Sequence, residues 1–344
     1  WPGEDSEDVP EPIDDGLDFR DVRGQLMAKR AVLCSAAGGH HALLLGPPGT
    51  GKSMIAQRSA GILAPLTPRT SVEATAIHSM AGLLREPVEV LRRPPLRAPH
   101  PSASLEGLIG GGASYLPGEA SLAHGGVLLL DEALEFKNSV LQSLREPLES
   151  RSIRIVRADG QAWYPARFTL LMTSNLCPCG ALGAEVQNCS CMASEIARYW
   201  GRLGEAVLDR IEVRAFLGND PEPEEDSEDA PGDPPSWDSE TMSRCVCRAR
   251  TIQWERLRKI GVETNAEIPP AALDLYCGLT SELDALLKDR AANARFSIRG
   301  EHAVRRVART VADLDNSPDI DERHLMLALR LRTQGRLDRI LQFA

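Results

Sequence analysis

A glycine-rich segment that follows an apolar run constrains this chain more than any other feature. The run Leu43–Leu45 predicts a short buried strand, and the next eight residues, GPPGTGKS, match the pattern G-x-x-x-x-G-K-[ST] in full. Glycines let backbone N–H groups wrap phosphates without a Cβ clash, and a helix predicted from Lys52 toward Leu63 points its positive end at them. We expect Lys52 to reach the β- and γ-phosphates of ATP and Ser53 to ligate Mg²⁺. The predicted nucleotide-binding residues are Gly46, Gly49, Thr50, Gly51, Lys52, Ser53 and Met54.

Two later strand ends carry the polar groups that such a site requires. The apolar run Val127–Leu130 predicts a central parallel strand, and Asp131 and Glu132 follow at its carboxyl end, where open α/β sheets bind ligands. We expect Asp131 to complete the Mg²⁺ shell with Ser53 and Glu132 to orient and polarise the attacking water. A third strand, RFTLLMTSN, ends at Asn175, whose amide either fixes that water or caps the next turn.

The net charge of −10 is distributed unevenly along the 344 residues. Residues 1–21 hold nine acids and one base, and residues 219–240 hold ten acids and no base, so the other 301 residues carry +8. Both acidic segments are rich in Pro, Gly and Ser, which predicts disorder. They divide the chain into an acidic leader at 1–15, a domain at 16–218, an acidic linker at 219–240 and a domain at 241–344.

The two domains have different patterns. Residues 16–218 alternate apolar runs with helical periodicity, which predicts an α/β core around a parallel sheet. The smaller second domain shows helical spacing almost throughout and is predicted to be all-α. Its clearest helical face consists of Val304, Val307, Ala308, Val311 and Leu314.

The order of these motifs resembles an AAA+ ATPase, and the similarity is closest to the Mg-chelatase-like ComM/YifB family. It covers about residues 16–335 and rests on DFRDVRGQLMAKRAV, LRAPHPSASLEGLIGGG, PGEASLAHGGVLLLDEALEF, LREPLESRSIRIVRADGQAWYPARFTLLMTSNLCPCG and FSIRGEHAVRRVARTVADL. The chain departs from the family pattern at His100-Pro101, at Asn175-Leu176 and in DEALEF, but keeps every phosphate-handling group. The family's usual amino-terminal Lon-like domain is not in this sequence.

The resemblance implies further roles. The segment VLDRIEV resembles the one that supplies an arginine finger, so Arg210 would reach the γ-phosphate bound by a neighbouring subunit. The alternative is that Arg210 pairs with Asp209 or Glu212 in its own chain. The segment FSIRG resembles the sensor-2 motif, which would make Arg299 a contact to the phosphates of its own chain. The family also implies a homo-oligomeric ring, most commonly a hexamer.

Two insertions bear on the substrate. Residues 151–168 are predicted to form a β-hairpin, because Ile153 and Ile155 alternate with arginines and Asp159-Gly160 is a strong turn signal. In the resembled family such a hairpin projects toward the ring pore, where its arginines would suit contact with a phosphate backbone; a solvated basic face is the alternative. A glycine-rich insert at about 105–119 suits a loop that shifts with nucleotide state.

Four of the eight cysteines fall in one loop, residues 177–191, directly after Asn175. Their two Cys-x-Cys pairs supply four thiolates, the tetrahedral set that structural zinc favours. We hypothesise that Cys177, Cys179, Cys189 and Cys191 bind one structural zinc. Reduced buried cysteines or a labile disulfide are the alternatives.

The combined prediction is a cytoplasmic Mg²⁺-dependent ATPase that couples ring motion to DNA, of the helicase or branch-migration type. Two alternatives are a motor subunit for metal insertion, as the chelatase likeness suggests, and a protein-remodelling ATPase. The absence of secretory features and the thiol content favour a reducing compartment.

Overall fold

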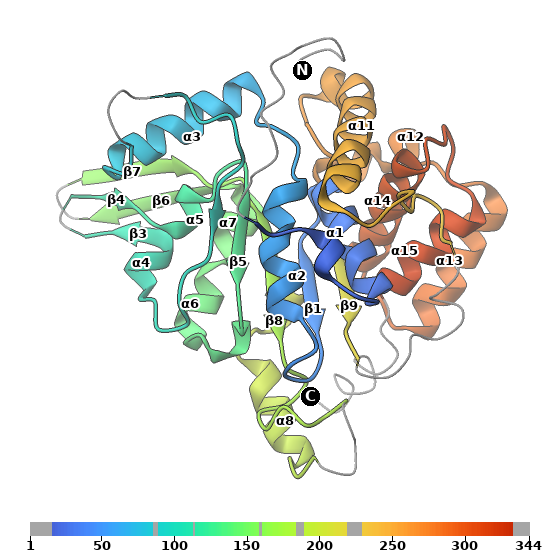
Figure 1. Cartoon of the computed structure of the whole chain (residues 1–344), viewed down its shortest axis with the longest axis horizontal. Helices are drawn as coiled ribbons and strands as arrows, with labels where there is room; N and C mark the ends of the chain where they lie inside the picture. Colours follow the sequence, from blue (N-terminus) through green and yellow to red (C-terminus); the bar gives the residue numbers. More distant parts are fainter. Residues whose placement is uncertain are drawn as a thin grey trace.

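The computed structural model describes residues 16–84, 89–112, 114–157, 160–183, 189–218 and 229–332. Its centre is a five-stranded sheet in the order β2-β5-β8-β1-β9, with every neighbouring pair parallel (Figure 1). The strands are β1 (Ala42–Leu45), β2 (Leu96–Arg97), β5 (Val127–Leu130), β8 (Thr169–Ser174) and β9 (Val213–Phe216). All residues of β1 and β5 are buried, which explains why both read as uninterrupted apolar runs.

Alternate residues of the sheet enter two different hydrophobic cores. Leu44 of β1 and Leu129 of β5 belong to one core, and Leu43 and Leu128 belong to the other, because successive side chains in a strand point to opposite faces. Helices therefore cover both sides of the sheet. In this domain they are α1 (Leu26–Gly38), α2 (Lys52–Arg58), α3 (Pro68–Met80), α4 (Leu105–Ile109), α5 (Glu119–Leu122), α6 (Asn138–Ser143), α7 (Arg145–Ser150), α8 (Ala193–Gly201) and α9 (Glu205–Leu208).

Two small hairpins lie beside the second core. Strands β3 (Gly110–Gly111) and β4 (Leu116–Pro117) form one within the glycine-rich insert, and β6 (Ser152–Arg157) and β7 (Gly160–Pro165) form the other. The Tyr164 hydroxyl donates to the backbone oxygen of Tyr115 at 2.6 Å, which ties the two hairpins together. Asp159, half of the turn signal, lies outside the described residues.

The carboxyl-terminal part is helical, as predicted, and it packs against the sheet domain (Figure 1). Its helices are α11 (Ser239–Leu257), α12 (Leu273–Tyr276), α13 (Ser281–Asn293), α14 (Ile298–Leu314) and α15 (Glu322–Arg332). Residues of α11, α14 and α15 share one hydrophobic core with α1 and β9. The α/β core followed by an all-α domain is therefore confirmed, and the two parts share a core instead of being joined only by a tether.

Part of the acidic segment predicted as a disordered linker is ordered. Residues 229–240 are described, and α11 begins within them at Ser239. Asp233 binds the guanidinium of Arg30 at 2.7 Å, and the Arg30 side chain is only 2% exposed. A buried guanidinium needs a carboxylate partner, so this acid has a structural place that composition does not reveal. Residues 1–15 and 219–228 lie outside the described residues.

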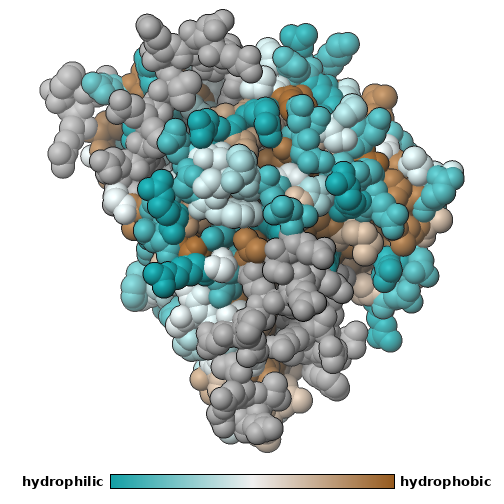
Figure 2. Space-filling view, turned by 45° about the vertical axis from the view of Figure 1, so that its right-hand side comes forward, coloured by the Kyte–Doolittle hydropathy of each residue, from teal (hydrophilic) through white to brown (hydrophobic). Residues whose placement is uncertain are grey.

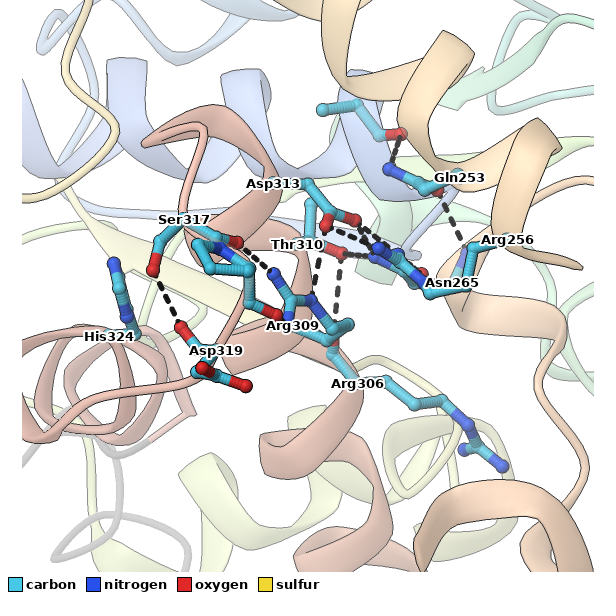
Figure 3. Close-up of polar contacts among 12 residues, drawn as sticks. Gln253, Arg256, Asn265, Arg306, Arg309, Thr310, Asp313, Ser317, Asp319 and His324 are labelled. Carbon is cyan, nitrogen blue, oxygen red and sulfur yellow. Dashed lines mark hydrogen bonds and ion pairs between the residues drawn. The ribbon is translucent and has the colours of Figure 1, made fainter. Parts of the chain in front are cut away.

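A buried polar network connects helices α11 and α14 of the helical domain (Figure 3). The Asp313 side chain is fully buried and accepts hydrogen bonds from Arg256 at 2.6 and 2.8 Å, from Arg309 at 3.1 Å and from Asn265 at 2.8 Å. One carboxylate thus compensates the half-buried guanidinium of Arg256 on α11 and the buried guanidinium of Arg309 on α14. Removing such a carboxylate leaves uncompensated charge in the protein interior.

The same network reaches the sheet domain through His40, the second residue before β1. His40 Nε2 lies 2.8 Å from the Thr310 hydroxyl on α14, and its Nδ1 lies 2.5 Å from a carboxylate oxygen of Glu212. Burial alone would raise the pKa of Glu212, but the charge and hydrogen bond of His40, together with Arg306, lower it. The paired carboxylate is therefore ionised at neutral pH, which fixes α14 beside the start of β9.

The outer surface is mixed in character. Figure 2 shows a face on which hydrophobic residues are interspersed with hydrophilic ones. Within the part of the chain that the structure describes, no helix combines the length and the apolar character needed to cross a bilayer.

Replacing Asp313 tests whether this network holds the helical domain. We expect Asp313→Ala to lower the free energy of unfolding by ~3–5 kcal/mol, because the buried guanidinium of Arg309 and the half-buried one of Arg256 lose their partner. Urea unfolding followed by circular dichroism measures the change, with the exposed Asp319→Ala as the matched control. If both variants unfolded at the same urea concentration, the network would not be a stabilising element.

Candidate nucleotide-binding and metal sites

The glycine-rich loop follows β1 at the carboxyl edge of the sheet and leads into α2. Glycine is required at Gly46 because a Cβ there would lie 2.2 Å from the backbone oxygen of Leu217. Gly49 and Gly51 have φ angles of +82° and +90°, which strain any other residue. The Thr50 hydroxyl donates to the Pro47 backbone oxygen at 2.9 Å and braces the turn. Met54, the last predicted nucleotide contact, lies on the first turn of α2.

The ammonium group of Lys52 lies inside this loop. Its Nζ donates to the backbone oxygens of Gly46 and Pro47, each at 2.7 Å, and to Asn175 Oδ1 at 3.1 Å. Burial lowers the pKa of Lys52, while the nearby carboxylates of Asp131 and Glu132 raise it. Asn175 is therefore at the cradle, within reach of the group that would bind the γ-phosphate. Phosphate oxygens can replace these neutral acceptors and supply the compensating charge.

The predicted Mg²⁺ ligands lie next to each other. Ser53 Oγ donates to Asp131 Oδ1 at 2.8 Å, which brings a hydroxyl and a carboxylate oxygen together across α2 and β5. Oxygen donors of this kind are what Mg²⁺ requires, with water and phosphate oxygens completing the octahedron. The residues present therefore fit a Mg²⁺–ATP site.

Thr173 is a site residue that sequence reasoning missed. Its hydroxyl donates to Asp131 Oδ1 at 2.5 Å and accepts the backbone N–H of Glu132 at 2.9 Å. Glu132 has a φ of +52°, and its side chain is exposed at the same edge of the sheet. Thr173 thus orients both acids. The available signal was a hydroxyl residue two positions before Asn175 in a strand predicted to end at the site.

Arg210 and Arg299 lie at the opposite edge of the sheet. They line a cavity of about 310 Å³, together with His41 just before β1, Gly126 just before β5, and Phe168 and Thr169 at the start of β8. All these neighbours mark the amino ends of the strands, whereas Lys52, Asp131 and Asn175 follow the carboxyl ends. Strands of four residues separate the two edges by about 10 Å at ~3.3 Å per residue.

This placement differs from the role that the resemblance implied for Arg299. In the described structure Arg299 lies at the amino edge of the sheet, away from the phosphate cradle of its own chain. Arg299 lies instead with Arg210: Glu149 accepts from Arg210 at 2.7 Å and lies 4.0 Å from Arg299. The in-chain partner of Arg210 in the structure is thus Glu149 on α7, a residue for which the sequence suggested no role.

The four clustered cysteines come together in space. Their Sγ atoms all lie within 4.8 Å of one another, and three of the pairs are at 3.4, 3.6 and 3.7 Å. Four thiolates at ~2.3 Å from a central zinc would be about 3.8 Å apart, so the cluster fits a tetrahedral metal. Among the described residues this is the group of acids, histidines or cysteines that satisfies such a geometry.

The thiols of this cluster differ in acidity. Burial raises the pKa of Cys177 to about 12, whereas the backbone N–H of Ala181 and the neighbouring thiols lower that of Cys179 to about 6. Cys34 and Cys277 lie elsewhere, buried in the core, and burial raises the pKa of each to about 12. These two thiols are protonated and unreactive at neutral pH.

The cysteine loop touches the phosphate loop directly. A Cβ at Gly180, one residue after Cys179, would lie 2.8 Å from Pro48 Cγ. On its other side the loop leads to α8, where the Trp200 indole donates to the Leu176 backbone oxygen at 3.1 Å. A metal bound here would hold the wall of the nucleotide site.

Comparison with known proteins agrees with this geometry. The family model for the magnesium chelatase subunit ChlI matches residues 18–224, and the model for its carboxyl-terminal part matches residues 236–332. The chain belongs to the Mg-chelatase-like family. Its nucleotide cradle and helical domain are the two parts that the family models describe.

Several curated relatives match over most of this chain. An uncharacterized protein of Mycobacterium tuberculosis is 41% identical over 324 residues, covering 92% of this chain and 62% of that protein. The uncharacterized protein YifB of Escherichia coli is 38% identical over 321 residues, and the competence protein ComM of Haemophilus influenzae is 38% identical over 324 residues; each match covers 93% of this chain and 61% of the relative. The chain thus spans about three fifths of the length of these relatives.

Proposed function

We propose that this chain is a Mg²⁺-dependent ATPase of the AAA+ type that assembles into a homo-oligomeric ring and drives motion on DNA. The observation that carries the proposal is the joint placement of Lys52, the Ser53–Asp131 pair and Glu132 at one sheet edge. One relative is named a competence protein, and the task we propose is of the helicase or branch-migration type, in transformation or recombination. We also propose that the protein acts in the cytoplasm.

The residues of the cradle have separable tasks in hydrolysis. Mg²⁺ bound with ATP supplies the positive charge that neutralises the β- and γ-phosphate oxygens. Ser53 and Asp131 would hold that ion, and Lys52, which now donates to backbone oxygens of the loop, would donate to the phosphates. Glu132 accepts the proton of the attacking water, with Asn175 beside the γ-phosphate to orient it. Thr173 fixes the Glu132 backbone so that its carboxylate faces the site.

Two arginines at the far edge suggest a site completed between subunits. In a head-to-tail ring the amino edge of one subunit faces the nucleotide of the next, as heterologous interfaces require. Arg210 and Arg299 would then leave Glu149 and contact the neighbour's γ-phosphate together. A planar, permanently charged guanidinium suits this task because it stabilises the charge that develops on the transferred group.

Mixing two inactive variants tests whether the active site is completed between subunits. We expect Lys52→Ala and Arg210→Ala each to lose ATPase activity, and their equimolar mixture to regain about a quarter of the wild-type rate, because a random ring pairs an intact cradle with an intact finger at that frequency. Steady-state phosphate release measures the recovery. If Arg210 acted on the nucleotide of its own chain, the mixture would regain no activity. Lys288→Ala, on the exposed face of α13, is the control for loss of a lysine.

The DNA assignment rests on charge and position. Outside its two acidic segments the chain carries +8, and the β6–β7 hairpin presents the exposed Arg154 and Arg157. The family description favours a second candidate, the motor of a metal-insertion complex, because magnesium chelatase is the name of the matched model. That candidate requires a partner protein and a porphyrin, and it gives DNA no role.

ATPase stimulation distinguishes these candidates. We expect single-stranded or branched DNA to raise the ATPase rate several-fold at low salt and less at high salt, because phosphate contacts release counterions. The measurement uses the full chain with and without each DNA at two salt concentrations. A rate that no DNA changes at low salt would favour the chelatase-like or protein-remodelling function.

We also propose that the clustered cysteines bind one structural zinc that fixes the loop against Pro48. Elemental analysis of protein purified without chelator is expected to find about one zinc per chain.

The double variant Cys179→Ser, Cys189→Ser should lose the metal and bind ATP more weakly, whereas Cys247→Ser on α11 should change neither metal content nor ATP binding. Acidification should release the metal because protons compete for the thiolates, most strongly at Cys177. A metal content far below one per chain would exclude the site.

A further inference from the structure

The β6–β7 hairpin has one face in the core and one face in solvent. Ile153, Ile155 and Tyr164 point inward and are buried in the second hydrophobic core. The opposite face is exposed and carries two large apolar side chains, Val156 at 64% exposure and Trp163 at 63%. The alternation follows from the period of two in a strand, so the outward position of Trp163 is set by the packing of its neighbours.

Trp163 belongs to neither hydrophobic core, and most of its surface is exposed. Trp200 shows the ordinary arrangement, with 2% exposure and its indole N–H bonded to Leu176. Tryptophan is a large side chain that usually buries most of its surface, and exposed aromatic side chains mark binding sites. Trp163 and Val156 lie on neighbouring positions of the same hairpin face, since Arg154 pairs with Trp163 and Val156 pairs with Gln161. The two apolar side chains therefore stand diagonally on one exposed face, with the Arg154–Gln161 pair on the other diagonal.

Positive charge is built into the same face. Arg154 stands directly across from Trp163 in the hairpin register, where side chains of paired residues lie about 5 Å apart at Cβ. The Arg154 guanidinium donates to Gln161 Oε1 at 2.6 Å, which keeps it on the outer face. Arg157 ends the strand on the opposite face, the one that carries Ile153 and Ile155, and lies 3.4 Å from Glu106, so Arg154 is the cation of the outer face. The face thus combines a flat aromatic ring with an adjacent cation.

We propose that Trp163 and Arg154 form a stacking platform for unpaired nucleotides, so that this motor engages single-stranded nucleic acid. A base stacks on the indole and the following phosphate contacts the guanidinium, a combination that binds single strands without sequence preference. Bases inside a duplex are already stacked on both faces, so an indole gains nothing from them. This inference rests on the proposed DNA function and names the strand that the hairpin contacts.

The platform is rigidly mounted and connected to the arginine edge. Tyr164, beside Trp163 on the inner face, bonds to the backbone of Tyr115, and a Cβ at Gly110 would lie 3.2 Å from Ile155 Cδ1. At the base of the hairpin Arg151 binds Glu267 of the helical domain at 2.8 Å. Glu149 lies two residues before Arg151 and binds Arg210. The partner of this arginine and the start of the hairpin therefore belong to one short stretch of backbone.

Binding of fluorescein-labelled oligo(dT) and of a blunt duplex of equal length tests the platform. With the full chain, we expect Trp163→Ala to weaken oligo(dT) binding about 5- to 150-fold, the equivalent of the ~1–3 kcal/mol that one stacked base contributes. Trp163→Phe keeps an aromatic ring and should retain most of the affinity. Arg154→Ala should lower the slope of log K against log salt by about 0.7, while Trp163→Ala leaves that slope unchanged.

Leu275→Ala removes an even more exposed apolar side chain, on α12, and is the matched control. Oligo(dT) affinity that is the same for Trp163→Ala, Leu275→Ala and the wild type would overturn the platform while leaving DNA-stimulated ATPase intact. Weaker binding of an unfolded polypeptide such as labelled casein, with oligo(dT) unaffected, would assign the face to protein. A smaller assembled mass for Trp163→Ala in size-exclusion chromatography would make Trp163 a subunit contact. If wild-type protein neither bound DNA nor responded to it, the proposed function itself would fail.

Discussion

The parallel direction of the five strands determines where every functional group of this chain can lie. Loops that follow strands gather at one edge, so Lys52, Asp131 and Asn175 converge although 123 residues separate the first from the last. Loops that precede strands gather at the other edge, so Arg210, just before β9, is carried away from its own phosphate cradle. A sheet in which β9 ran antiparallel would bring this arginine to its own nucleotide. The division between the two edges therefore follows from strand direction, and subunit assembly is what would bring the two sets of groups together.

The groups that the structure brings together as expected were those whose signal is local. The apolar run Val127–Leu130 predicted a buried strand with Asp131 at its end, the glycine-rich motif predicted Ser53 beside it, and a third strand was predicted to end at Asn175. Contacts between distant segments left no such signal. Asp233 is 203 residues from Arg30, and its fixed place follows from the need of a buried guanidinium for a partner, which no local composition reveals. The acidic segment was therefore predicted to be a solvated linker.

Arg299 shows a second limit of sequence reasoning. A motif indicates what chemistry a residue can perform, but not toward which subunit it points. That direction depends on how α14 sits on the sheet, and its position is set by an exposed contact from Ser297 to Asp209 and a buried one from Thr310 to His40. Those partners lie in three separate parts of the chain. The same reasoning explains why Glu149 was missed: an exposed acid on a short helix is unremarkable until two arginines are seen beside it.

Glu149 is also the residue that would connect a nucleotide bound between subunits to the β6–β7 hairpin. In the isolated chain its carboxylate takes the place that phosphate oxygens would occupy between Arg210 and Arg299, because both kinds of oxygen match the guanidinium fork. A triphosphate carries more charge than one carboxylate, so binding across a seam would draw both arginines away from α7. The end of α7 continues through Arg151, which has a φ of +56°, into the first strand of the hairpin. A change in the pairing of Glu149 therefore acts on a helix of six residues that is covalently joined to β6, and the inner face of that hairpin is packed too firmly for it to move independently. In the proposed ring, breaking the Glu149 pair and displacing the hairpin would be parts of one transition, which is the minimum requirement for coupling hydrolysis to movement of a bound strand.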